Sequence, residues 1–399
     1  FFPILFFLLA FVIGISAGTT VLVGQAWGAQ NLEKVRCVIG STLFMTLIGG
    51  SVIAVLGVMM AEPMLKLLGT DAKVMHLSLP YVQWMLAGSP LLFFYIIYTS
   101  ILRGVGDSVT PLIALSLTSL IGLAVTPVLL KGYFGFPALG IVAPAIATIL
   151  GYAAVLIFLG FYLNYKNHPL KIDARLLQSI RHDATLSKLI LKLGIPTGIQ
   201  MVTTSLAGLV IIGLVNHYGA HATAAYGAVN QVLNYIQFPA LSISIAASIF
   251  AAQAIGAGKP DLLAKVTRTA LGMNVIFTGS LITLAYLFSK YLMALFITDH
   301  SVIELGQQLL FIVLWAVLFF GASAIFASIM RASGTVNVPM MINILTIILI
   351  EVPCAYWFSS LWGLTGIWTA YALSFVCLCV LQASYYQFVW KKTKIKVLI

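Results

Sequence analysis

Apolar stretches without a charged residue follow one another along the whole chain, and short polar connections separate them. Most stretches have at least about 20 residues, the length that a helix needs to cross the hydrocarbon core of a bilayer. They lack the period-two alternation of barrel strands, so we expect membrane-spanning helices. The eleven predicted spans are 1–25, 37–61, 78–102, 110–130, 138–164, 189–215, 223–253, 269–289, 306–330, 338–358 and 364–390.

Two of the uncharged stretches are long enough to hold two spans each. The polar segment 216–221 divides the first pair, and the segment 359–363 divides the second. Polar and glycine-containing segments suit a tight turn at the membrane surface.

The composition supports a membrane protein. Apolar residues make up 61% of the chain and charged residues 8%, whereas a soluble domain carries about 25% charged residues. The net charge of +11 comes from basic residues in the short connections, without interleaved aromatic residues. We therefore expect no nucleic-acid partner.

The Lys and Arg residues predict the orientation of the chain. With the C-terminus in the cytoplasm, 17 of the 21 basic residues lie on the inner side. The outer side then holds Lys66, Lys73, Lys131 and Lys290. Because inner loops are enriched in Lys and Arg, we expect a multi-pass, monomeric protein of a bacterial inner (plasma) membrane with a cytoplasmic C-terminus.

The chain resembles itself at an offset of 228 residues. The segment Gln-Ala-Trp-Gly-Ala at 25–29 aligns with Gln-Ala-Ile-Gly-Ala at 253–257. In the same register, Ser-Ile-Leu-Arg at 100–103 aligns with Ser-Ile-Met-Arg at 328–331, and each is followed by a matched glycine and proline. Two motifs in one register indicate an internal duplication.

The repeat predicts the organisation of the fold. The matched helices are six spans apart, and an even displacement keeps the orientation, so the halves are parallel repeats. The helix at 189–215 opens the second half, and we expect its counterpart in a helix that precedes residue 1. The prediction is an all-α polytopic membrane protein of two parallel six-helix repeats, a twelve-helix fold whose first helix is missing from this chain. Its expected parts are an N-terminal lobe at 1–165 with five visible helices, a cytoplasmic linker at 166–188 and a C-terminal lobe at 189–399 with six helices.

Both repeated motifs suit the ends of helices. Gly28 and Gly256 are predicted to permit a left-handed exit from the helix. In the second motif, the arginine lies where it can bind the last carbonyls of one helix, and the proline lies in the first turn of the next. A structural role in the two turns explains these residues without any chemistry.

The same segments resemble the multidrug and toxic compound extrusion (MATE) family. The first is the Gly-Gln-Ala-x-Gly-Ala segment at 24–29 with its counterpart at 252–258. The second is a Leu-Arg-Gly-x-Gly-Asp turn that ends in proline. Its matching residues are Leu102, Arg103, Gly104, Gly106, Asp107 and Pro111. The resemblance covers essentially the whole chain.

The resemblance implies a two-lobe antiporter with a twelve-helix MATE-like fold. Its expected activity is export of organic, often cationic and amphipathic drugs or metabolites by alternating access of a cleft between the lobes. Protons or sodium ions would drive export, without another cofactor. The familiar coupling acids of the family are absent here: the corresponding positions hold Gly122, Thr126 and Thr204, and a further expected Asp falls near Phe320.

Signatures of enzymes and metal sites are absent from the sequence. The chain contains no P-loop, G-x-S-x-G, H-E-x-x-H or paired Cys-x-x-Cys motif. We therefore expect no catalytic residues, no metal and no enzyme activity, and we expect coupling to an ion gradient in place of ATP.

Polar residues within the predicted spans are the candidates for substrate binding. The helix at 223–253 is the richest, and Asn230, Asn234 and Gln237 share one of its faces at helical spacing. Such a face suits a wet cleft, although a polar contact between helices is the alternative. The candidate substrate-binding residues are Tyr226, Asn230, Gln231, Asn234 and Gln237, with Gln200, Thr203 and Thr204 on the preceding helix. Thr203 and Thr204 can instead bond to their own helix.

Glu351 is the candidate ion-coupling residue, because it is the only acidic residue well inside a predicted span. An ionised acid at such a position is costly, and intramembrane carboxylates commonly mark ion pathways. Pro353 removes a backbone donor nearby and so frees a carbonyl at about Leu349. A neutral glutamic acid that hydrogen-bonds a neighbouring helix for packing alone is the alternative.

Two other functions compete with drug export. A lipid-linked oligosaccharide flippase of the same superfamily is expected to need cations for a pyrophosphate, and the middle of each predicted span lacks Lys and Arg. A channel or receptor is the third interpretation. The proline-interrupted helices at Pro127, Pro239 and Pro353 fit alternating access better.

Overall fold

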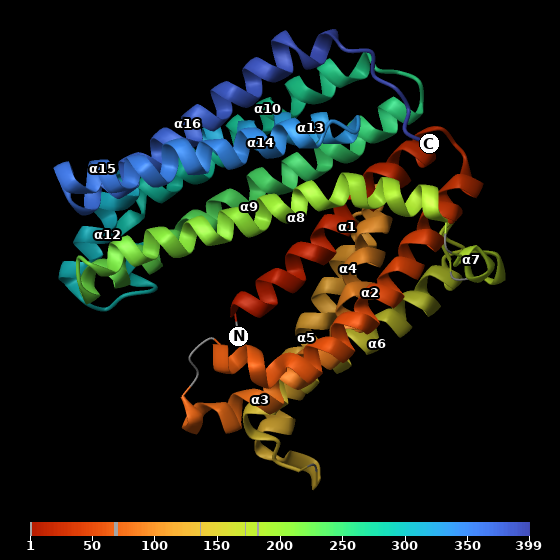
Figure 1. Cartoon of the computed structure of the whole chain (residues 1–399), viewed down its shortest axis with the longest axis horizontal. Helices are drawn as coiled ribbons and strands as arrows, with labels where there is room; N and C mark the ends of the chain where they lie inside the picture. Colours follow the sequence, from red (N-terminus) through yellow and green to blue (C-terminus); the bar gives the residue numbers. More distant parts are fainter. Residues whose placement is uncertain (1, 68–70, 136, 172, 182) are drawn as a thin grey trace. The chain divides into compact units, whose positions relative to one another are not determined.

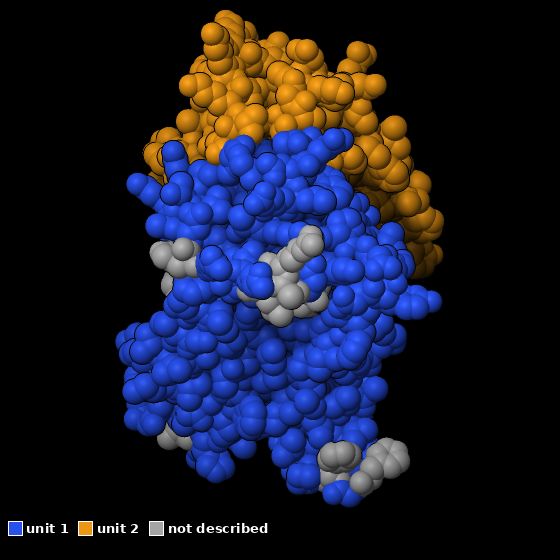
Figure 2. Space-filling view, turned by 90° about the vertical axis from the view of Figure 1, so that its right-hand side faces the viewer, with its two compact units in different colours: residues 1–195, 399 blue, residues 196–398 orange. Residues whose placement is uncertain are grey.

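The computed structural model describes residues 2–67, 71–135, 137–171, 173–181 and 183–399, and all regular structure in them is helical. This confirms the all-α prediction. The chain forms two compact units, residues 1–195 with 399 and residues 196–398, which Figure 2 distinguishes by colour. The boundary falls inside one long helix, and the proposed division into lobes and linker stays a prediction.

Unit 1 is a bundle in which α4 packs against α1 and α2, and α5 packs against α6 (Figure 1). Short 3₁₀ turns connect α5 to α6. Its helices are α1 (Phe2–Gly28), α2 (Leu32–Leu67), α3 (Ala72–Ala87), α4 (Ser89–Gly104), α5 (Val109–Lys131), η1 (Tyr133–Gly135), η2 (Gly140–Val142), α6 (Ala143–Tyr165), α7 (Ala174–Ser179) and the first part of α8 (Ala184–Asn216).

Unit 2 is built around α9 and α13, which pack along each other and against α10 and α16 (Figure 1). After α8, its helices are α9 (Ala220–Gly256), α10 (Leu262–Leu287), α11 (Ser289–Ala294), α12 (His300–Val313), η3 (Leu314–Ala316), α13 (Val317–Ala332), α14 (Asn337–Thr346), η4 (Ile347–Glu351), α15 (Val352–Trp362), α16 (Leu364–Phe388) and η5 (Trp390–Lys392). The buried Trp368 belongs to its larger apolar cluster.

The described residues contain 10 helical segments that are long and apolar enough to span a membrane, and a bent pair supplies an eleventh. The two predicted divisions are confirmed, since α8 ends at Asn216 and α15 ends at Trp362. The span predicted at 78–102 is bent, because the chain turns by 45° between α3 and α4. Pro90 lies in the first turn of α4 and cannot donate a backbone hydrogen bond to α3, which explains the break.

The backbone repeats the internal duplication at two turns. Gly106 and Gly334 both have a left-handed conformation, with φ of 93° and 87°. The expected left-handed exit at Gly28 and Gly256 is wrong. It occurs two residues later, at Gln30 with φ of 56° and at Gly258 with φ of 68°. The exits still lie in the 228-residue register.

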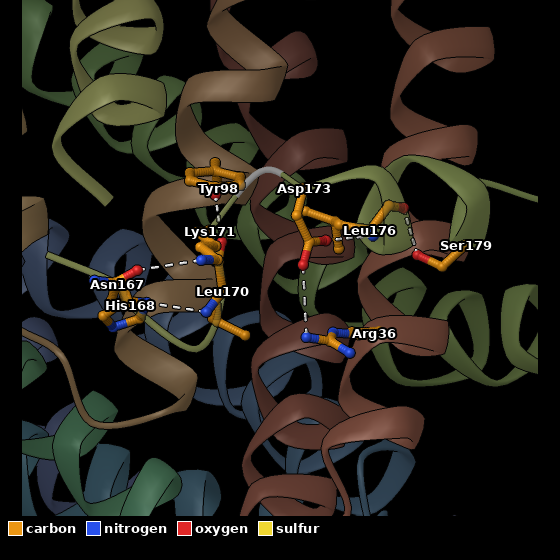
Figure 3. Close-up of polar contacts among 9 residues, drawn as sticks. All are labelled: Arg36, Tyr98, Asn167, His168, Leu170, Lys171, Asp173, Leu176 and Ser179. Carbon is orange, nitrogen blue, oxygen red and sulfur yellow. Dashed lines mark hydrogen bonds and ion pairs between the residues drawn. The ribbon is translucent and has the colours of Figure 1, made fainter. Parts of the chain in front are cut away.

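The segment that follows α6 makes polar contacts with α2 and α4 of the same unit (Figure 3). The Tyr98 hydroxyl donates to the carbonyl of Leu170 at 2.9 Å, and Arg36 pairs with Asp173 at 3.8 Å. Helix α7 packs along α2. These contacts tie the predicted linker to the ends of α2 and α4.

Candidate functional site

The polar residues predicted on α9 lie on a partly open face of that helix. Gln231 and Asn234 are exposed, and Asn230 and Gln237 are half-buried. The opposite face of α9 is buried against α13 through alanine and branched aliphatic residues. Helical spacing therefore separates an apolar packing face from an amide-rich face.

These four amide side chains make no hydrogen bond to another side chain within the described residues. An amide offers two donors and one carbonyl acceptor. We refer to Asn230, Gln231, Asn234 and Gln237 as the amide face. It can offer hydrogen bonds to a polar group of a cargo molecule without first breaking contacts inside the protein.

Tyr226 does not belong to the amide face, although the sequence groups it there. Its side chain is buried in the apolar cluster of unit 2, with its ring centroid 5.4 Å from that of Trp368. Its hydroxyl lies 3.3 Å from the hydroxyl of Tyr371, and either group can donate. Tyr226 thus contributes to the packing of α9 against α16.

The polar residues of α8 are also less available than the sequence suggests. The Thr203 hydroxyl donates to the carbonyl of Ile199, and the Thr204 hydroxyl donates to the carbonyl of Gln200, each at 3.0 Å. Hydrogen bonds that return to the same helix satisfy the hydroxyl donors locally. No hydrogen bond joins these side chains to the amide face in the described residues.

Glu351 is 8% exposed and is the only one of the ten acidic residues, all of them described, that is buried. The Ser374 hydroxyl of α16 donates to its Oε2 at 2.9 Å. Within the described chain it has no ion pair, so no cation offsets a negative charge there. A buried carboxyl group in this setting favours binding of a proton or another cation.

Glu351 ends the π-helical segment η4, and Val352 donates its N–H to the carbonyl of Ile347. The sequence pointed to an irregularity here through Pro353, which lacks an N–H, but it did not predict a π-helix. A wider turn of this kind interrupts the regular ladder and is frequent at functional sites. It places Glu351 on the face that packs against α16.

Sequence reasoning missed several buried polar residues that share a region with Glu351. Ser374 is one of them, and it donates a hydrogen bond to Glu351. Further along α16, the Gln382 amide donates to the carbonyl of Pro339 at 2.9 Å. The signal that could have identified this face is the eight-residue step from Ser374 to Gln382, which returns a polar side chain to the same side of a helix.

The described residues contain no group of three or more His, Cys, Asp and Glu side chains that could hold a metal ion. In these residues the hydrogen-bond partner of the Glu351 carboxyl group is the Ser374 hydroxyl.

Comparisons with known proteins identify the family. The sequence model of the MatE family matches residues 1–128 and 196–357. The chain is 44% identical to the Bacillus subtilis protein named "Probable multidrug resistance protein YoeA", over 100% of this chain and 87% of that protein. It is 27% identical to the "FAD transporter" of Shewanella oneidensis, over 92% of this chain and 80% of that protein.

Solved structures show the same fold. The crystal structure of a mutant of the Vibrio cholerae MATE transporter VcmN matches with a TM-score of 0.89 at 20% identity, over 99% of this chain and 88% of that chain. This likeness agrees with the predicted two-repeat helical architecture. The protein is therefore a multi-pass membrane protein, it is a transporter and not an enzyme, and it belongs to the MATE family.

Proposed function

We propose that this protein exports organic, often cationic and amphipathic drugs or metabolites by alternating access of a cleft between its two lobes. A proton or sodium gradient drives the export. Family membership and the relative named as a multidrug resistance protein support an export function. The proposal includes a monomer in the bacterial inner membrane, and the distribution of Lys and Arg predicts its cytoplasmic C-terminus.

The observation that carries the coupling proposal is the buried carboxyl group of Glu351. It is held by a neutral hydroxyl, at a π-helical irregularity, inside a spanning segment. Moving an ionised acid to the centre of a membrane helix costs about 2.5–3.5 kcal/mol on insertion scales. Neutralisation by a proton or another cation removes much of this cost, so occupancy of the site can follow the ion gradient.

The proposed cargo-binding surface is the amide face of α9. Its side chains offer both donors and acceptors, and aromatic residues such as Tyr235 and Phe238 are exposed beside them. A mixed surface of this kind accepts a cargo that has an apolar body and a polar group.

The test is export from proteoliposomes with a fluorescent lipophilic cation as cargo, driven separately by a pH gradient and by a sodium gradient. We expect Glu351→Gln to insert normally and to lose gradient-driven export, because Gln retains the hydrogen bonds but cannot take up a proton. Glu304→Gln is the matched control, since Glu304 is an exposed acid on α12. Wild-type export by Glu351→Gln between pH 6 and 8 would refute the coupling role.

A flippase for a lipid-linked oligosaccharide is the alternative, and the relatives named as multidrug resistance proteins do not favour it. Its cargo would carry a pyrophosphate, for which cationic side chains are the expected partners. Competition by a lipid-linked pyrophosphate and by a free flavin dinucleotide belongs in the same assay, because one relative is named as an FAD transporter. Export of either cargo in preference to the lipophilic cation would replace the proposed substrate class.

A further inference from the structure

Buried polar side chains follow Glu351 along α16 toward the C-terminal end of unit 2. Ser374 and Gln382, eight residues apart, lie on one broad side of α16. Tyr386 is buried further along the helix, and Trp390 is buried in η5 beyond its end. Tyr386 shares a hydrogen bond of 2.7 Å with Thr267, and the Trp390 indole donates to Ser333 at 3.0 Å. A face that only packs apolar helices together does not need this series of polar groups.

Helix α14 and segment η4 oppose this face and have polar residues in a matching register. Asn343 precedes Glu351 by eight residues, and Gln382 follows Ser374 by eight residues. Because the two segments pack antiparallel, Asn343 comes to the level of Gln382. The buried hydroxyl of Thr346 lies between these levels and donates to the carbonyl of Ile342 at 2.7 Å.

Two oxygen atoms at this level are buried and have no hydrogen-bond partner among the residues that the structure describes. They are Oδ1 of Asn343 and Oε1 of Gln382. A buried polar atom without a partner costs about 1–3 kcal/mol, so such atoms are normally satisfied by ordered water. Both acceptors belong to the two facing segments that also hold Glu351 and Ser374.

We propose that this face is a hydrated proton path that connects Glu351 with the C-terminal end of unit 2. We name the path by Glu351, Ser374, Thr346, Asn343 and Gln382. The proposal rests on the proposed role of Glu351 as the coupling carboxyl, and it specifies the proton as the ion. Eight residues of helix correspond to about 12 Å, a distance that a short chain of waters spans.

The path transfers a proton through hydrogen-bonded waters, and each water is unchanged after the transfer. A proton that reaches Glu351 binds one carboxyl oxygen, and each water on the path passes one proton on as it receives another. The hydroxyl hydrogens of Ser374 and Thr346 are already donated to Glu351 and to the carbonyl of Ile342, so these two hydroxyl oxygens accept hydrogen bonds from the waters. Asn343 and Gln382 accept through their carbonyl oxygens.

Infrared difference spectroscopy tests the path independently of export. The carboxyl band of Glu351 is assigned by its loss in Glu351→Gln, and its shift is timed after transfer of the reconstituted protein into D₂O. We expect rapid exchange in the wild type and at least tenfold slower exchange in Gln382→Met and Asn343→Leu. Asn343→Leu keeps the bond from Gln382 to Pro339, so it separates loss of water from loss of that contact. Gln387→Met is the control, since Gln387 is exposed on the same helix.

Equal exchange rates in the wild type, Gln382→Met and Asn343→Leu would overturn the path, and so would the absence of an exchanging carboxyl band at Glu351. The export assay tests the coupling role independently of the path: wild-type export by Glu351→Gln refutes the coupling role. Slow exchange in both path variants with normal exchange in Gln387→Met supports the path, because it shows that the waters reach Glu351 along this face.

Discussion

Gly106 and Gly334 have almost the same left-handed backbone conformation, although they close turns in different units of the chain. In each case an arginine ends the preceding helix three residues earlier, and a proline lies in the first turn of the next helix five residues later. The duplicated sequence therefore produces a duplicated turn. A side chain at either glycine would strain the backbone.

We expect Gly106→Ala and Gly334→Ala each to lower the free energy of unfolding by about 1–2 kcal/mol. The two losses should be similar, because a Cβ atom at Gly334 would meet only the end of the flexible Leu398 side chain, at 2.9 Å, and that side chain can move aside. Thermal stability in detergent measures both effects. Gly122→Ala is the control, since that glycine is helical and a Cβ atom would meet nothing within 4 Å.

Two helices of unit 1 approach closely at glycine residues. A Cβ atom at Gly194 of α8 would lie 2.5 Å from the carbonyl oxygen of Gly14, and one at Gly18 of α1 would lie 2.6 Å from that of Ile190. Small residues four apart permit such backbone packing in membrane helices. We expect Gly194→Ala to cost about 1–3 kcal/mol. Gly208→Ala on the same helix should be neutral or stabilising, because nothing lies within 4 Å there.

Much of the fold follows from hydropathy alone. Length and apolarity are local properties, so the spans and the two turns at Asn216 and Gly363 are recognisable in sequence. The bend between α3 and α4 is less evident, since helical patterning continues across Gly88 and only Pro90 indicates a break. The left-handed exit at Gln30 is harder still, because glycine is the usual residue there and the sequence offers Gly28.

The candidate site was predicted only in part, for a physical reason. Composition identifies Glu351 as an acid inside a span, and periodicity identifies the amide face. The partners of Glu351 depend on which face of α16 packs against η4, and a sequence does not specify that packing. Tyr226 shows the same limit, because Gln231 and Asn234 on the same helix are exposed whereas the side chain of Tyr226 is buried.

His168 should make the segment after α6 sensitive to acid. Its Nδ1 accepts a hydrogen bond from the N–H of Leu170 at 3.1 Å, which requires an unprotonated Nδ1. Burial lowers the pKa of His168, and Asp107, 3.7 Å away, opposes the shift only in part. The unfolded chain then binds a proton more readily than the folded protein does. The contribution of neutral His168 to the free energy of unfolding is therefore complete above the ordinary pKa of 6.5. It decreases as the pH drops from 6.5 toward the lower pKa of His168 in the folded protein.

The pH dependence of thermal unfolding between pH 7 and 5 measures this effect. We expect His168→Asn to flatten the pH profile, because the Asn carbonyl can accept from Leu170 but does not titrate in this range. His217→Asn is the control, since His217 is exposed. A profile for His168→Asn with the same slope as the wild type would show that other groups cause the acid sensitivity.

Substitutions in the amide face and in the threonines of α8 are expected to have different effects on cargo binding. Asn234 is exposed and has no side-chain partner in the described residues, whereas the Thr204 hydroxyl already donates to Gln200. A hydrogen bond between neutral groups contributes about 1 kcal/mol, which corresponds to about a fivefold change in affinity. We expect Asn234→Leu to raise the KM for a cationic cargo about fivefold with little change in kcat, and Thr204→Val to change either constant less than twofold. If the amide face lies against lipid, Asn234→Leu will raise thermal stability and leave the KM unchanged, and the cargo must then bind another surface.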